Sequence, residues 1–148
     1  MAERRNTRWL WIAVLAVLTL FIFSRSLMNG ERSMQESSLV QSALWRVLGD
    51  GVVSRFLYRW IRKVAHFSEY AVLGGAWCGY DRRFRPSRWW LWGAGPVTAG
   101  IDECLQFVSP GRSPQLSDAL LDCVGYACGA ALIGLLVWVC IRRKQHKT

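Results

Sequence analysis

The longest apolar stretch of the sequence is ALLDCVGYACGAALIGLLVWVCI, residues 119–141. A helix that spans a membrane needs ~20 mostly apolar residues, and this stretch meets that length with Asp122 as its one charged residue. Its apolar residues surround the whole circumference of a helix instead of forming a single stripe. We therefore expect a helix that crosses a lipid bilayer.

Three further segments outside this stretch are typical of membrane spans: residues 9–27, 64–80 and 89–108. The first is strongly apolar, whereas the other two contain ionisable residues, namely His66, Glu69, Asp102 and Glu103. The sequence thus predicts an all-α membrane protein with four transmembrane helices, built as one domain over residues 1–148. A soluble all-α core is the alternative fold.

The composition favours the membrane protein. Nine of the 148 residues are Trp and 52% are hydrophobic, yet the formal net charge is +9. The mean hydropathy is positive, at +0.15, whereas a soluble basic domain such as a nucleic-acid binder is hydrophilic on average. We therefore expect the lipid bilayer as a partner and no nucleic acid, with the charges in loops and the apolar residues in spans.

Basic residues beside the span ends set the expected orientation. Three clusters fall on one side of the predicted membrane: Arg4, Arg5 and Arg8; Arg82, Arg83, Arg85 and Arg88; and Arg142, Arg143, Lys144 and Lys147. The positive-inside rule places this side in the cytoplasm, and most of the tryptophans lie near the same span ends. Both termini are therefore expected inside. A cleaved signal peptide is the alternative for the first span, and it gives the same orientation.

A basic amphipathic helix is expected in the long outer loop between the first two spans. After the break at residues 49–51, apolar residues recur at helical spacing: Val52, Val53, Phe56, Leu57, Trp60, Ile61 and Val64. The basic residues between them are Arg55, Arg59, Arg62 and Lys63. Such a helix lies flat on a leaflet, with its basic face toward lipid phosphates. It would either position the second span or engage an anionic ligand.

The polar residues within the spans all fall in the half of the membrane that faces outside. They are Ser24, Arg25 and Ser26; His66 and Glu69; Asp102, Glu103 and Gln106; and Asp118 and Asp122. Residues three or four apart share a helix face, and charged groups in spans face the bundle or a water-filled cavity. We expect a polar chamber open to the outer surface, completed by Arg112 from the loop after the third span. The structural alternatives are a helix cap at Asp118 and a strut between helices at His66.

Such a chamber suits two kinds of chemistry. Carboxylates bind Mg²⁺, Mn²⁺ or Ca²⁺, and an imidazole admits Zn²⁺, so a divalent cation is one candidate ligand. A pair of buried titratable groups could also act as general acid and base, and the catalytic candidates are His66, Glu69, Asp102 and Glu103. The sequence lacks Gly-x-Ser-x-Gly, Walker and His-Glu-x-x-His motifs. Whether the protein is an enzyme stays open at this point.

Three stretches of the sequence resemble the VanZ-like family of bacterial membrane proteins. Residues 63–74, KVAHFSEYAVLG, are similar to the family's Lys-x-x-His-Phe-x-Glu-Tyr motif. Residues 102–112, DECLQFVSPGR, are similar to its Asp-Glu-x-x-Gln-x-x-x-Pro-x-Arg segment. Residues 118–125, DALLDCVG, follow its Asp-x-x-x-Asn-x-x-Gly pattern, except that Asp122 stands where the family usually has Asn. The resemblance covers roughly residues 9–136.

The resemblance implies a function in the bacterial cell envelope, because the family's namesake raises resistance to the glycopeptide teicoplanin. We expect a plasma-membrane protein that modulates susceptibility to such drugs through the polar pocket, with an outer-leaflet envelope lipid or a lipoglycopeptide as its ligand. The residues expected to bind it are Lys63, His66, Glu69, Tyr70, Asp102, Glu103, Gln106, Arg112, Asp118 and Asp122. Two alternatives are a membrane enzyme that acts on a lipid-linked or headgroup substrate, and an assembly protein whose polar network only fixes helix register. The sequence predicts no oligomeric state.

Overall fold

The computed structural model describes residues 2–27, 42, 45–46, 52–84, 88–109 and 115–145. Within these ranges the chain forms four long helices and no strand: α1 (Ala2–Leu27), α3 (Val52–Phe84), α4 (Arg88–Val108) and α5 (Leu116–Gln145). The expected all-α fold is therefore confirmed. Three of these helices extend well past the predicted spans: α1 begins before Trp9, α3 begins before Val64, and α5 continues after Ile141.

The largest difference from the sequence-based expectation lies in α3. The sequence predicts an amphipathic helix over residues 52–64 that is separate from the second span, but the structure has one continuous helix from Val52 to Phe84. No Gly or Pro occurs between residues 52 and 73, so nothing in the sequence ends one helix before the next begins. The amphipathic segment is thus the first part of α3, and its position on a membrane surface stays a prediction.

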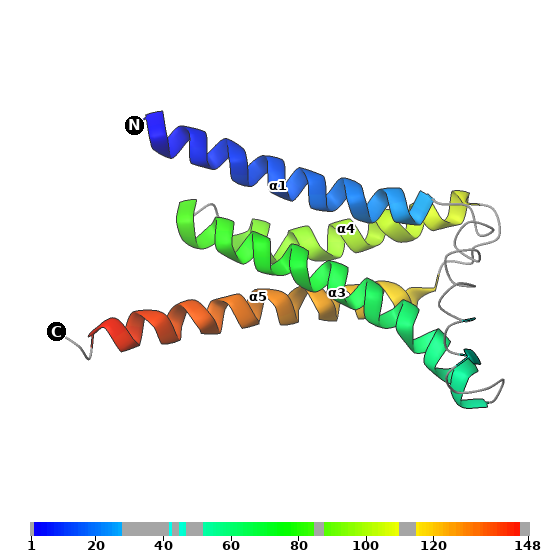
Figure 1. The fold of residues 1–148 in the computed structure, drawn as a ribbon. Coiled ribbons are helices and arrows are strands. Elements are labelled where there is room, and N and C mark those ends of the chain that lie inside the picture. Colours follow the sequence, from blue (N-terminus) through cyan, green and yellow to red (C-terminus); the bar gives the residue numbers. More distant parts are fainter. Residues whose placement is uncertain are drawn as a thin grey trace.

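The four helices alternate in direction (Figure 1). The start of α1 and the end of α5 lie at one end of the molecule, which we call the terminal end, together with the end of α3 and the start of α4. The end of α1, the end of α4 and the start of α5 lie at the opposite end, which we call the loop end. Residues at these helix ends are therefore neighbours in space although they are distant in the sequence.

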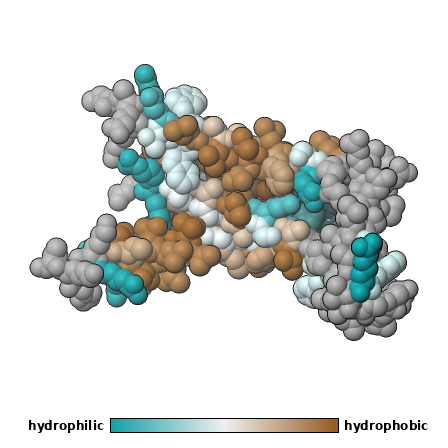
Figure 2. Space-filling model, viewed as in Figure 1, coloured by the Kyte–Doolittle hydropathy of each residue, from teal (hydrophilic) through white to brown (hydrophobic). Residues whose placement is uncertain are grey.

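The outer surface of the bundle is strongly apolar. Among the described helices, two are long and apolar enough to cross a membrane, over Arg5–Leu27 and Leu116–Arg143. Large apolar side chains project outward from both, including Leu10, Val17, Leu20, Leu132 and Leu135. Figure 2 shows an apolar band over the middle of the molecule. A soluble monomer rarely exposes so much apolar surface, so this surface favours a lipid environment over the soluble all-α alternative.

The backbones of α3 and α5 touch at glycines. A Cβ atom on Gly129 of α5 would overlap the backbone carbonyl of Ala71 in α3. From the other side, a Cβ atom on Gly74 of α3 would overlap the carbonyl of Tyr126. Together with Gly125, these residues form the close contact that a Gly-x-x-x-Gly pair permits. Gly125 and Gly129 supply this contact from α5, and Gly74 adds to it from α3.

A small core fills the space between the helices. Tyr70 and Leu73 of α3 are fully buried, and Ile22 of α1 and Tyr126 of α5 are nearly so. The Tyr126 hydroxyl donates to the backbone carbonyl of Leu91 at 2.7 Å, which ties α5 to α4. A buried tyrosine usually needs such a partner for its hydroxyl.

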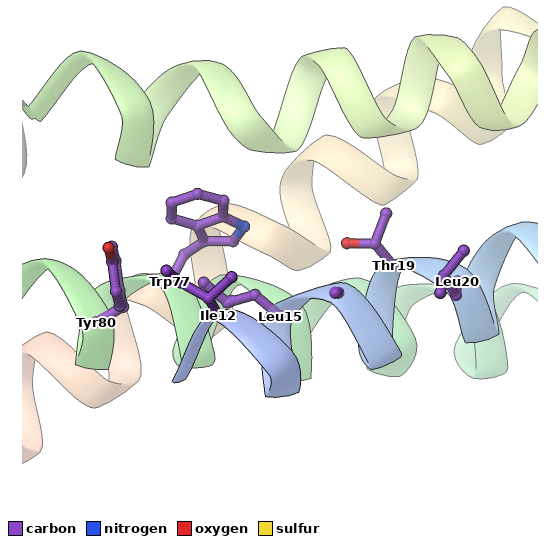
Figure 3. Close-up of a pocket in the computed structure, with 7 residues that line it drawn as sticks. Ile12, Leu15, Thr19, Leu20, Trp77 and Tyr80 are labelled. Carbon is purple, nitrogen blue, oxygen red and sulfur yellow. The ribbon is translucent and has the colours of Figure 1, made fainter. Parts of the chain in front are cut away.

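An open apolar pocket of about 480 Å³ lies between α1 and α3. Figure 3 shows side chains of α1 facing Trp77 and Tyr80 of α3, and the lining residues are Ile12, Leu15, Ala16, Thr19, Leu20, Trp77 and Tyr80. Tyr80 also links α3 to α1 by a hydrogen bond, since Arg8 Nε donates to its hydroxyl at 3.2 Å. None of the residues that line the pocket belongs to the polar residues expected to bind a ligand.

The glycine contact between α3 and α5 leads to a test with a matched control. Gly129→Ala should lower the free energy of unfolding in detergent by about 1–3 kcal/mol, because the added methyl group forces the helices apart. The melting temperature should fall with it. Gly100→Ala in α4 meets no atom within 4 Å, so it should be neutral or stabilising, since Ala favours a helix by ~1 kcal/mol over Gly. Equal melting temperatures for both variants would contradict the contact.

Candidate functional site

Three helices bring one polar side chain each to a common point. His66 of α3, Asp102 of α4 and Asp122 of α5 have ligating atoms within 4.8 Å of one another. Asp102 is 0% exposed and Asp122 is 1% exposed, while His66 is partly buried. We call these three residues the triad. All three belong to the residues that the sequence places in one half of the membrane.

Asp102 is held by hydroxyl and amide donors from two helices. The Ser26 hydroxyl, at the end of α1, donates to Asp102 Oδ1 at 2.6 Å, and both residues are fully buried. Gln106 lies one turn along α4, and its Nε2 donates to Asp102 Oδ2 at 3.4 Å. The hydroxyl of Ser109 reaches the Ser26 carbonyl at 3.0 Å, which adds a second link between α1 and α4. These bonds fix the orientation of the Asp102 carboxylate and the place of α1 beside it.

Asp122 lacks hydrogen bonds of the kind that hold Asp102 in the described part of the chain. Both of its carboxylate oxygens are buried, and neither has a hydrogen-bond partner within the described ranges. Its charge interacts with four other carboxylates, those of Asp102, Glu103, Asp118 and Glu69. A buried carboxylate is costly to leave without a partner, by several kcal/mol for the charged form. The triad is thus the place in the described fold where a cation or a proton would relieve the largest electrostatic cost.

Two ion pairs lie around the triad. Arg25 Nε at the end of α1 is 3.5 Å from Glu69 Oε1, and Lys63 Nζ of α3 is 4.0 Å from Asp118 Oδ1. These side chains are partly exposed, and such pairs contribute only ~0–1 kcal/mol each to stability. Asp118 also lies in the first turn of α5, where the helix dipole stabilises a negative charge. The two pairs place charges of both signs beside the buried triad.

Glu103 supports the start of α5. Its Oε2 accepts a hydrogen bond from the backbone amide of Gln115 at 3.0 Å, and Gln115 directly precedes α5. Glu103, twelve residues before Gln115 in the sequence, therefore helps to position the helix that carries Asp122. Glu103 was expected to act in ligand binding or catalysis, and this contact gives it a positioning function as well.

The structure gives neighbouring residues of α3 different partners. His66 and Glu69 were expected to share one face; His66 belongs to the triad, while Glu69 forms an ion pair with Arg25 of α1 and also interacts electrostatically with Asp122. Tyr70 is fully buried in the core, with a hydroxyl that has no partner in the described part of the chain. Arg112 lies outside the described residues. The expected pairing of Asp102 with Gln106 is present as a hydrogen bond.

Sequence reasoning missed the partners that hold the expected site residues. Ser26 and Arg25 were visible as polar residues at the end of the first span, but a single sequence does not tell which helix they face. Ser109 and Gln115 gave no signal at all, because a serine or a backbone amide beside a loop is common. Their roles follow only from the packing of α1 against α4 and from the turn before α5.

The triad offers one imidazole and two carboxylates. This donor set could hold a divalent cation, because carboxylate and imidazole are both ligands of Zn²⁺ and Mn²⁺. It could equally support proton transfer, since a histidine beside buried carboxylates is a common acid–base arrangement. The residues of the triad therefore fit either chemistry that the sequence suggested.

The family was established by comparison with known proteins. A family model described as VanZ/LLP1 matches residues 10–138. No curated protein and no solved structure matches the chain. The matched region covers well over half of the sequence and contains the triad, its hydrogen-bond partners and both surrounding ion pairs. As its motifs predicted, the chain belongs to the VanZ/LLP1 family.

Proposed function

We propose that this membrane protein crosses the bilayer four times, with both termini in the cytoplasm and the loop end outside. Two described helices are apolar enough to span by composition. The 33 residues of α3 and the 21 of α4 are long enough as well, at ~1.5 Å per residue against a hydrocarbon core of ~30 Å. The polar residues Asp102 and Gln106 of α4 are buried inside the bundle, where lipid does not reach them.

The side chains at the terminal end support this orientation. Arg5, Arg82, Arg83, Arg142 and Arg143 all lie near helix ends there, as the positive-inside rule requires of a cytoplasmic side. Trp89 is 85% exposed at the start of α4, and Trp9 and Trp138 are exposed near the same end. Exposed tryptophans prefer the interface between lipid and water. In this topology all four helices belong to one integral membrane domain.

The proposed role is to modulate susceptibility to teicoplanin-type glycopeptides at the outer face of a bacterial plasma membrane. The observation that carries it is the polar cluster at the loop end of an otherwise apolar bundle, in a chain of the VanZ/LLP1 family. In Figure 2, hydrophilic residues reach the surface near the loop end. An outer-leaflet envelope lipid, or a lipoglycopeptide with its acyl chain in the bilayer, would bring its polar part to this depth.

An enzyme is the second candidate. It is favoured by one specific arrangement, the imidazole of His66 beside the buried carboxylates of Asp102 and Asp122. The substrate would be a lipid-linked or headgroup-bearing envelope component that enters from the outer leaflet. Mass spectrometry of envelope lipids from cells with wild type and with His66→Gln would reveal a product that disappears in the variant. Identical lipid profiles would exclude this candidate for the lipids measured.

The proposed topology leads to a prediction for reporter fusions. Green fluorescent protein fused after Thr148 should fluoresce, because the fusion stays in the cytoplasm, and alkaline phosphatase at the same position should be inactive. Alkaline phosphatase placed in the connection between α4 and α5 should be active, because this connection is outside. Active phosphatase after Thr148 would contradict the topology.

The proposed role leads to a prediction for drug susceptibility. Expression in a sensitive Gram-positive host should raise the minimum inhibitory concentration of teicoplanin, and Asp102→Asn should abolish the increase, because it removes the carboxylate that joins the Ser26 and Gln106 side chains. Ser68→Ala is the matched control. This serine lies on α3, is exposed, and donates to the carbonyl of Val64 in its own helix at 2.6 Å.

Membrane levels of the variants must be equal in this comparison, and melting temperatures of the purified proteins show whether they fold. We expect wild type and Ser68→Ala to confer resistance, and folded Asp102→Asn to confer none. Wild type without any change in susceptibility would refute the proposed role, and resistance with Asp102→Asn would separate that role from the polar cluster.

A further inference from the structure

The triad differs from an ordinary buried polar contact because each of its members comes from a different helix. The ligating atoms of His66, Asp102 and Asp122 all lie within 4.8 Å of one another. Both oxygens of Asp122 are buried and have no hydrogen-bond partner in the described fold. We propose that the triad is a binding site for one divalent transition-metal ion, with Zn²⁺ as the ion that it favours.

The spacing of the ligating atoms is close to that of a metal site. Zn²⁺ binds histidine nitrogen and carboxylate oxygen at ~2.0–2.2 Å, so its ligand atoms are about 3.4 Å apart in a tetrahedral site. The three atoms here span up to 4.8 Å and would move inward by roughly 1 Å on binding. Rotation about the side-chain bonds of His66 and Asp122 supplies such a movement without any shift of the helices.

The charge of the site supports a divalent ion. Two ionised carboxylates, those of Asp102 and Asp122, carry a total of two negative charges, which one divalent cation neutralises. Without it, Asp122 interacts electrostatically with Asp102 and with three further carboxylates, those of Glu103, Asp118 and Glu69. The ion pairs of Glu69 with Arg25 and of Asp118 with Lys63 compensate charges outside the triad. Neither carboxylate oxygen of Asp122 has a hydrogen-bond partner among the described residues.

The side chains around the triad hold Asp102 in a fixed orientation, as the outer partners of metal ligands do. Ser26 and Gln106 each donate to one oxygen of Asp102, and such outer partners fix the orientation of ligating side chains in metal sites. The hydroxyl of Tyr70 is fully buried, has no partner in the described fold, and interacts electrostatically with Asp102 and Asp122. It is available to donate to a water molecule or a phosphate oxygen in the fourth position of the metal, which three protein ligands leave open.

The donor set selects among divalent ions. Ca²⁺ takes six to eight oxygen ligands and Mg²⁺ keeps several waters in an octahedral shell, whereas the triad has three protein ligands of which one is nitrogen. An imidazole with carboxylates suits Zn²⁺ and its transition-metal neighbours. A proton shared between Asp102 and Asp122 would also relieve the repulsion, and it is the competing explanation that the experiment must exclude.

The test measures metal binding by the full-length protein, purified in detergent and stripped with a chelator. Titration with Zn²⁺ against a chromophoric chelator should give one tight site in the wild type. Asp122→Asn should weaken binding by more than the ~10–100-fold expected for loss of an outer partner, and Ser26→Ala should weaken it by about that 10–100-fold. Asp81→Asn is the matched control. It removes a partly buried carboxylate near the terminal end of α3 and should bind Zn²⁺ like the wild type.

Two further readouts separate the triad from other ligands and from misfolding. Co²⁺ in the site should give visible d–d absorption without thiolate charge-transfer bands, because the triad contains no cysteine. Zn²⁺ should raise the melting temperature of the wild type but not that of Asp122→Asn. The apo form of this variant should be at least as stable as the apo wild type, since the substitution removes an unpartnered charge.

The outcomes are distinct. The proposal is overturned if the wild type binds no Zn²⁺, or if wild type and folded Asp122→Asn bind it with equal affinity. Thiolate bands with Co²⁺ would overturn it as well. His66→Gln serves as a second ligand variant should Asp122→Asn fail to fold, and unchanged affinity there would overturn it as well. The metal site is measured on purified protein, so its failure is distinguishable from failure of the proposed role in drug susceptibility.

Discussion

The contact between the backbones of α3 and α5 determines the geometry of the rest of the molecule. Gly74, Gly125 and Gly129 remove the side chains that would otherwise keep the two helices apart, and the crossing is fixed where they meet. A Cβ atom on Gly125 would lie 2.5 Å from the carbonyl oxygen of Phe67, the residue after His66. Asp122 precedes Gly125 by one helical turn. The same close approach that packs the helices therefore sets the distance between the imidazole and the carboxylate.

α1 joins this pair of helices through polar contacts near its two ends. Ser26 binds Asp102 near the loop end, and Arg8 binds Tyr80 near the terminal end. Between these contacts α1 is apolar and largely exposed, and the pocket against α3 interrupts its packing. Hydrogen bonds are worth more where water is absent. The buried Ser26–Asp102 bond therefore serves the fold and the polar cluster together, because it positions a helix while it orients a carboxylate.

Much of this arrangement could be predicted from the sequence. The apolar stretches predicted the helices, and the positions of the ionisable residues along those stretches predicted that they gather at one end of the bundle. The continuity of α3 was missed, because an amphipathic segment and an apolar segment joined without Gly or Pro form one helix regardless of their different surroundings. The separate partners of His66 and Glu69 were not predicted either, because two residues on one helix face can contact different neighbouring helices. The helix that each side chain contacts depends on how the helices pack, and the spacing of residues within one segment does not specify that packing.

The continuity of α3 has a mechanical consequence. The helix is ~50 Å long at ~1.5 Å per residue, which exceeds a hydrocarbon core of ~30 Å, and its first turns extend beyond the rest of the bundle at the loop end (Figure 1). A helix of this kind transmits torque, because its hydrogen-bonded turns resist twisting. The length of one helix thus ties the place of its first turns to the place of His66, and through the glycine contact to that of Asp122 on α5.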